Sequence, residues 1–105
     1  MIDSNIATKE DVNFLPKIIG VILGIRYSTE TATLLGCEID RKNQEACAVY
    51  KTPRGLYFCT VKTKKWPSGK IMAIDEQLAI KYYGDMYIKC VEFSEAFPDM
   101  EIQDA

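Results

Sequence analysis

The sequence contains no histidine, and this absence removes the commonest general base and the commonest metal ligand. Four cysteines are present, at Cys37, Cys47, Cys59 and Cys90, but no two of them form a C-x-x-C pair. Zinc ribbons and dithiol redox sites depend on such close pairs. We therefore expect mostly buried thiols, no metal and no cofactor.

The motifs of the common enzyme classes are also missing. The chain has no glycine-rich phosphate loop, no G-x-S-x-G nucleophile elbow and no paired-carboxylate motif. A cysteine nucleophile would have only lysine or carboxylate side chains to activate it. The sequence thus predicts a protein that is not an enzyme.

Long hydrophobic runs are absent as well. The longest apolar stretch, residues 14–25, is interrupted by Pro16 and Lys17, whereas a membrane-spanning helix needs about 20 apolar residues. The charged residues 9–11 that precede it do not form the positive start of a secretion signal. We expect a cytoplasmic protein whose thiols are reduced.

The composition is that of a globular protein, with 48% hydrophobic and 27% charged residues. We expect a single domain over residues 1–105, with loosely held ends at residues 1–12 and 99–105. Charge is unevenly spread along the chain. Residues 46–74 carry six bases and no acid, and residues 75–105 carry eight acids and two bases.

The strongest local pattern is a β-hairpin in the middle of the chain. Two runs of strand-forming residues, 45–52 and 56–61, flank the tripeptide Pro53-Arg-Gly55. Proline at the first turn position and glycine two residues later favour a type I turn that closes on a left-handed glycine. The resulting register pairs Thr52 with Leu56, Tyr50 with Phe58, Val49 with Cys59 and Cys47 with Val61.

Both faces of this hairpin are apolar, whereas a hairpin exposed on one side alternates apolar and polar residues. One face carries Cys47 and Cys59, and the other carries Tyr50 and Phe58. We expect one of the two faces to meet the helices and the remaining one to meet either the N-terminal segment or another chain. Cys47 and Cys59 become diagonal neighbours on their face, near enough to oxidise in air.

Further strands are predicted on both sides of the hairpin. Residues 26–39 are rich in threonine and other strand formers, and they lead into the polar turn 40–43. After a lysine-rich connection that holds the one tryptophan, residues 70–74 form a short strand.

Two helices are predicted at the C-terminal end. Asp75 is a suitable N-cap for the first, and Gly84 is expected to end it. The second is expected to begin at Asp85, because apolar residues then recur at helical spacing until Pro98. These residues are Met86, Cys90, Phe93 and Phe97.

The segment 13–25 gives conflicting signals. Its apolar residues at 15, 18, 19 and 22 have helical spacing, but Gly20, Gly24 and β-branched Val21 favour an extended chain. We predict a helix here, and a weak capping signal from Thr8 with Asp11 before it. The fold class is then α+β: a small antiparallel β-meander of three to four strands, two C-terminal helices and one N-terminal helix.

Two motifs resemble a group of small uncharacterised proteins from phages and mobile elements of Gram-positive bacteria. They are Tyr27-Ser-Thr-Glu-Thr-Ala32, similar to Y-x-T-x-T-A, and Val49-Tyr-Lys-Thr-Pro-Arg-Gly-Leu-Tyr-Phe58, similar to L-Y-x-T-x-x-G-x-Y-F. The resemblance covers residues 26–99. It implies no catalytic residues, but it implies a setting in which small inhibitors of host defence, including anti-CRISPR proteins, are common.

These observations predict a small module that binds another protein, as an anti-CRISPR-like inhibitor of a bacterial defence complex. An alternative is a single-stranded nucleic-acid binder that uses the basic stretch from Lys51 to Lys70. A third is a homodimer joined through Tyr50 and Phe58 or through Cys47 and Cys59. The candidate contact residues are Tyr50, Tyr57, Lys64, Lys65 and Trp66 on the hairpin side, and Glu92, Glu95 and Asp99 on the acidic side.

Overall fold

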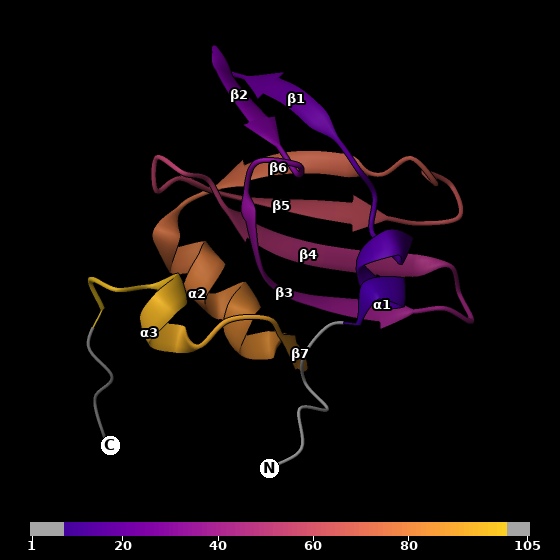
Figure 1. The fold of residues 1–105 in the computed structure, drawn as a ribbon. Helices are drawn as coiled ribbons and strands as arrows, with labels where there is room; N and C mark the ends of the chain where they lie inside the picture. The colour runs from indigo at the N-terminus through magenta and orange to yellow at the C-terminus, as the bar shows by residue number, and fades with distance from the viewer. Residues whose placement is uncertain (1–7, 101–105) are drawn as a thin grey trace.

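A five-stranded antiparallel sheet forms the centre of the protein in the computed structural model, which describes residues 8–100 (Figure 1). Four strands follow one another as a meander, and a fifth pairs with the far edge of the first, so that the order is β6-β5-β4-β3-β7. Their bounds are Thr33–Asp40 for β3, Glu45–Lys51 for β4, Tyr57–Lys62 for β5, Lys70–Ile74 for β6 and Ile88–Lys89 for β7.

The predicted central hairpin is confirmed. β4 and β5 pair with Tyr50 opposite Phe58, Val49 opposite Cys59 and Cys47 opposite Val61. Gly55 has φ +86°, the left-handed conformation that the turn requires. The short strand expected at residues 70–74 is β6, and the turn expected at residues 40–43 separates β3 from β4.

Helices cover one face of the sheet, as expected. α2 (Glu76–Asp85) begins at Asp75, whose side chain accepts a hydrogen bond from Leu78 N at 2.8 Å. It packs with the short α3 (Phe93–Ala96) against the strands, and the aromatic rings of Tyr57 and Phe97 stack 5.4 Å apart. The core on this side comprises Leu35, Val49, Tyr57, Cys59, Ala79, Tyr83, Met86, Ala96 and Phe97.

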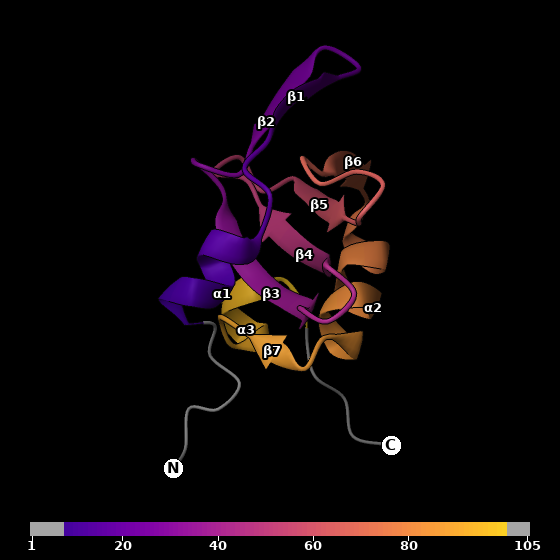
Figure 2. The same ribbon diagram turned by 90° about the vertical axis from the view of Figure 1, so that its right-hand side faces the viewer.

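The N-terminal segment covers the other face, which is one of the two occupants expected for it (Figure 2). Leu15 and Tyr27 are buried there, and the Tyr27 ring meets Phe58 edge-on at 5.5 Å. Tyr50 stacks on Phe58 at 4.9 Å with nearly parallel rings. Both apolar faces of the hairpin are therefore covered by the chain itself.

The helix predicted over residues 13–25 is wrong. α1 is shorter and earlier, at Lys9–Phe14, with the capping box of Thr8 and Asp11 in place. It ends because Leu15 precedes a proline, which favours the extended backbone that Leu15 adopts.

A β-hairpin occupies the rest of this segment. β1 (Ile19–Ile22) and β2 (Ile25–Ser28) form a separate two-stranded sheet that projects from the body of the protein (Figures 1 and 2). We call this unit, residues 19–28, the hairpin arm. The β-rich run 26–39 is thus divided between β2 and β3, with a turn at residues 29–32 between them.

The second C-terminal helix, predicted from Asp85 to Phe97, is also wrong. α2 continues through Gly84 to Asp85, and Lys89 then donates hydrogen bonds to the carbonyl oxygens of Tyr83 and Met86 at its end. β7 pairs with the open edge of β3. Of the residues predicted to form the second helix, only those of the single turn α3 are helical after α2 ends. A distant strand edge has overridden the local pattern.

The fold is therefore α+β, with more strands than the three to four expected. None of the described helices is long and apolar enough to span a membrane. Residues 9–12, from the stretch expected to be loose, belong to α1. The loose ends expected at residues 1–7 and 101–105 lie outside the described residues.

Thr60 provides a test of the core. It is fully buried on β5, and its hydroxyl makes no hydrogen bond of good geometry among the described residues, although the Tyr50 hydroxyl is nearby. Thr60→Val should raise the free energy of unfolding by about 1 kcal/mol, because it removes a buried polar group at nearly constant volume.

Thr52→Val is the control with the opposite expectation. It should lower the free energy of unfolding by about 1 kcal/mol, since the Thr52 hydroxyl accepts a hydrogen bond from Leu56 N at 3.0 Å. Urea denaturation measures both; a loss of stability in Thr60→Val would contradict this description of the core.

Candidate interaction surface

The hairpin arm carries the most exposed large hydrophobic side chains of the described residues. Leu23 is 98% exposed at the tip, and Val21 and Ile19 are 65% and 61% exposed on the outer face. Isolated exposed apolar residues are ordinary, but a contiguous group of them marks an interaction site. The arm is therefore the strongest candidate for a binding surface.

The arm is fixed to the body along its inner face. Tyr27 packs into the core, and Gly20 lies so close to Ile71 of β6 that an added Cβ would be 2.8 Å from the isoleucine methyl group. At the base, Thr29 N donates to Ile18 O at 3.0 Å, and Ile18 N donates to the Thr29 hydroxyl at 3.0 Å. The arm thus presents Ile19 and Val21 outward from a defined position.

The tip of the arm places a hydrophobic residue where both solvent and backbone disfavour it. Ile22 pairs with Ile25, which leaves a two-residue turn of Leu23 and Gly24. Both have positive φ, +50° and +80°, as a type I′ turn requires. The sequence that such turns prefer at these two positions is asparagine followed by glycine. Leucine adds backbone strain and exposes its side chain to water, so folding does not explain its presence.

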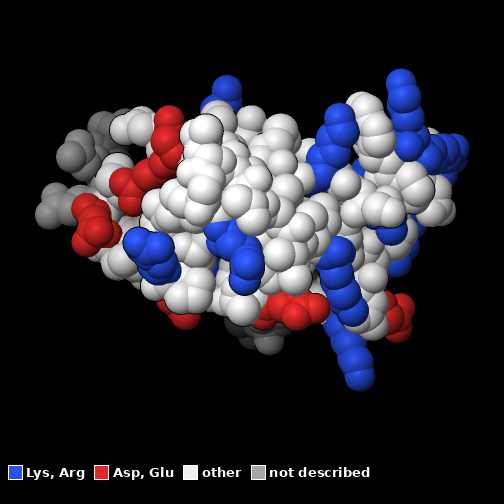
Figure 3. All heavy atoms as spheres, turned by 90° about the horizontal axis from the view of Figure 1, so that it is seen from above, with Lys and Arg blue, Asp and Glu red and all other residues white. Residues whose placement is uncertain are grey.

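Charge is unevenly distributed over the side of the molecule that carries the arm (Figure 3). Seen from the side of the arm, most of the basic side chains lie in the right half, and a group of acidic side chains lies at the left end. The basic stretch includes the loop that joins β5 to β6, where Trp66 is 42% exposed. The ammonium groups of Lys70 and Lys65 lie 3.6 Å and 5.5 Å from the centre of its ring.

Two predicted contact residues are not on the surface. Tyr50 and Tyr57 are both buried, one on each face of the sheet, and burial raises the pKa of each to about 12. The Tyr57 hydroxyl donates to Ala96 O at 3.2 Å. Their rings stack on Phe58 and Phe97, so we correct their assignment: they are core residues that a partner does not reach.

The other predicted residues are exposed but form two separate groups. Lys64, Lys65 and Trp66 lie in the loop between β5 and β6, and Glu92, Glu95 and Asp99 lie on and beside α3. The structure therefore does not bring the basic and acidic candidates together into one site. Tyr50 and Phe58, proposed for a homodimer, are covered by the N-terminal segment of the same chain.

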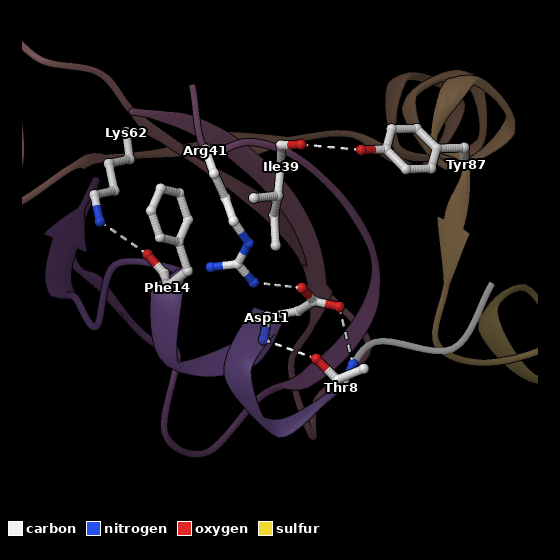
Figure 4. Close-up of polar contacts among 7 residues, drawn as sticks. All are labelled: Thr8, Asp11, Phe14, Ile39, Arg41, Lys62 and Tyr87. Atoms are coloured by element: carbon white, nitrogen blue, oxygen red, sulfur yellow. Dashed lines mark hydrogen bonds and ion pairs between the residues drawn. The ribbon is translucent and has the colours of Figure 1, made fainter. Parts of the chain in front are cut away.

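A wide groove of about 870 Å³ lies where α1 meets the ends of β3, β4 and β5. Arg41 pairs with Asp11 at 2.7 Å, and Lys62 donates to the Phe14 carbonyl oxygen at 3.0 Å (Figure 4). Both cations also lie over the Phe14 ring, at 5.2 and 4.0 Å from its centre. Because these groups satisfy one another, we assign them the role of holding α1 on the sheet.

The four cysteines are thiols, and three of them, Cys37, Cys47 and Cys59, have raised pKa values and therefore low reactivity. Cys47 and Cys59 share a smaller cavity of about 270 Å³ beside α2, and burial raises the pKa of both. A hydrogen bond with Cys90, and burial, raise the pKa of Cys37. Among residues 8–100, no three cysteine or carboxylate side chains are placed to share a metal ion.

No protein-family model, curated protein or solved structure matches this chain. The function must therefore be inferred from the surface itself. Sequence reasoning missed the hairpin arm, although one signal for it was present: two short runs with strand-forming residues, 18–22 and 25–28, on either side of Leu23-Gly24.

Leu23→Asn tests the tip of the arm. The change removes strain from a left-handed position and an exposed apolar side chain, so we expect the free energy of unfolding to rise by about 0.5–1 kcal/mol. Urea denaturation gives the value, and amide exchange in residues 19–28 should become slower. A clear loss of stability would mean that Leu23 has a structural role.

Asp11 makes the attachment of α1 dependent on pH. The backbone N–H of Thr8 and the Arg41 guanidinium hold the pKa of Asp11 below its usual 3.8. Because folding lowers this pKa, the stabilising effect is complete above about pH 4 and is lost as the pH falls through the folded value. The helical NMR shifts of residues 9–14 should decrease in that range. Asp11→Asn should weaken them at neutral pH and remove the transition.

Proposed function

We propose that this protein is a small non-enzymatic binding module whose hairpin arm docks into an apolar cleft on another protein. Leu23 carries the proposal: it is 98% exposed and strained at a turn where a polar residue would stabilise the fold. A residue that is unfavourable for its local backbone conformation and its exposure, and that adds no stability to the fold, indicates a functional role. Ile19 and Val21 extend the same apolar surface.

Charge near the arm favours an acidic partner over a second copy of the chain. In a symmetric dimer the same patch meets itself, so Arg26, which lies opposite Val21 on the arm, would enter the same interface as Arg26 of the second copy. Like charges brought together oppose association. A cleft with an apolar floor and a carboxylate rim matches both the arm and its surroundings.

The proposed setting is the cytoplasm of a bacterium, with a host defence complex as the partner. The motifs at residues 27–32 and 49–58, which resemble those of small phage and mobile-element proteins, support this choice. An inhibitor of this kind acts by occupying a surface, so it needs exposed anchors and no catalytic group.

A second candidate is the binding of single-stranded nucleic acid by the loop between β5 and β6. The exposed ring of Trp66 beside Lys64 and Lys65 favours it, because such sites combine stacking with phosphate contacts. Lys70 lies over the Trp66 ring, however, and Tyr57 is buried, which leaves little surface for stacked bases.

The test is capture of a partner by the tagged protein from a bacterial lysate treated with nuclease, followed by measurement of affinity for the captured protein. The variant Val21→Thr/Leu23→Asn should lose at least about tenfold in affinity, because two apolar anchors are removed. Val12→Thr is the matched control, since Val12 is also an exposed valine but lies on α1. Its affinity should equal that of the wild type.

Two other results would contradict the proposal. If the arm variant binds the same protein as tightly as the wild type does, the arm is not the binding surface. If only nucleic acid is recovered without nuclease, and Lys64→Gln/Lys65→Gln abolishes it, the second candidate is correct.

A further inference from the structure

A short groove separates the hairpin arm from the turn between β4 and β5. It has a volume of about 310 Å³ and is lined by Gly24, Ile25, Arg26, Ser28, Thr31, Thr52, Pro53, Arg54 and Leu56. Arg26 lies directly opposite Val21 in the register of the arm. The groove therefore adjoins the exposed apolar face of the arm.

The two arginines in this groove come from separate elements, and neither is directly paired with a carboxylate, although Glu30 lies in the adjacent turn. Arg26 belongs to β2 and Arg54 to the 53–55 turn. No acidic residue lines the groove, and within the described part of the chain neither guanidinium has a hydrogen-bond or ion-pair partner. Two unpaired guanidinium groups beside one cavity create a positive potential that attracts an anion.

Hydroxyl groups in the groove are available as additional donors. Ser28 Oγ accepts a hydrogen bond from Glu30 N at 3.2 Å, and Thr52 Oγ1 accepts one from Leu56 N at 3.0 Å. Each oxygen already serves as an acceptor, so its proton remains to be donated. Ile25, Pro53 and Leu56 supply apolar surface beside these donors.

We propose that this groove binds an aspartate or glutamate side chain of the partner, held between Arg26 and Arg54, with a neighbouring apolar residue against Ile25 and Leu56. This inference rests on the proposed function and specifies the partner segment as acidic and partly apolar. Arginine matches a carboxylate because its planar donors form paired, charge-assisted hydrogen bonds. The proposed cleft on the partner has a carboxylate rim, and that rim would supply such a side chain.

A peptide carboxylate fits this groove better than a nucleic-acid phosphate. No aromatic side chain lines the groove, whereas single-stranded nucleic acid is bound through stacked bases as well as phosphates. The apolar wall formed by Ile25 and Leu56 suits an aliphatic side chain next to the carboxylate.

The experiment is an NMR titration of the full chain labelled with ¹⁵N. The probes are a capped peptide of alternating leucine and glutamate, the same peptide with glutamine for glutamate, and a thymidine octanucleotide. We expect the glutamate peptide to shift the Nε–H signals of Arg26 and Arg54 and the amide of Leu56. Arg26→Gln/Arg54→Gln should weaken this binding at least about tenfold, because the charge-assisted bonds are lost.

Lys42→Gln/Lys81→Gln is the matched control. It also removes two positive charges, but from exposed positions outside the groove. Its affinity should stay within about twofold of the wild type, since exposed distant charges are screened. Three results would overturn the site: equal binding of the glutamine peptide, no shift of either arginine at about 10 mM peptide, or tighter binding of the octanucleotide to the same signals.

The two proposals fail in different ways. If the arm variant loses the captured partner while the peptide leaves both arginine signals unmoved, the carboxylate site is wrong and the proposed function stands. If the peptide binds between the arginines but the arm variant captures its partner normally, the carboxylate site stands and the proposed function is wrong.

Discussion

The β4–β5 hairpin is apolar on both faces, and the need to cover both of them places most of the remaining elements. α2 and α3 bury one face around Val49, Tyr57 and Phe97. Leu15 and Tyr27 bury the other around Tyr50 and Phe58. A small domain has few apolar side chains with which to cover both faces of a hairpin. The chain therefore uses its N-terminal segment as a second layer, held by α1 and its contacts with Arg41 and Lys62.

The tip and the outer face of the hairpin arm are the parts of that layer that cover nothing. The inner face contributes Tyr27 and Ile22 to the core, but the arm as a whole projects from the body of the protein (Figure 2). Leu23 at the tip, and Val21 and Ile19 on the outer face, leave large apolar side chains exposed to water. An extension that adds exposed apolar surface and backbone strain is understandable when its contacts are made in another molecule.

The sequence predicted those elements whose signals are local. Pro53 and Gly55 define one turn, and Asp75 caps one helix, without help from distant residues. The errors occurred where a distant element decides: β3 offers an open edge that draws residues 88–89 into a strand. The burial of Tyr50 and Tyr57 is not predicted, because the N-terminal segment covers one and α3 covers the other, and no local pattern places these segments on the sheet. Lys64, Lys65 and Trp66 are exposed, as a lysine-rich loop indicates. The arm was missed because apolar residues at helical spacing are ordinarily buried.

Site-specific photocrosslinking in living bacteria tests the central claim most directly. A photoreactive phenylalanine derivative at Val21, on the outer face of the arm, is compared with the same residue at Gln77, which is exposed on α2. The account predicts that Val21 crosslinks to one protein, that Gln77 does not, and that Leu23→Asn in the same chain weakens the crosslink. Crosslinks of equal yield at both positions, or at Gln77 alone, would show that the arm is not where this protein meets its partner.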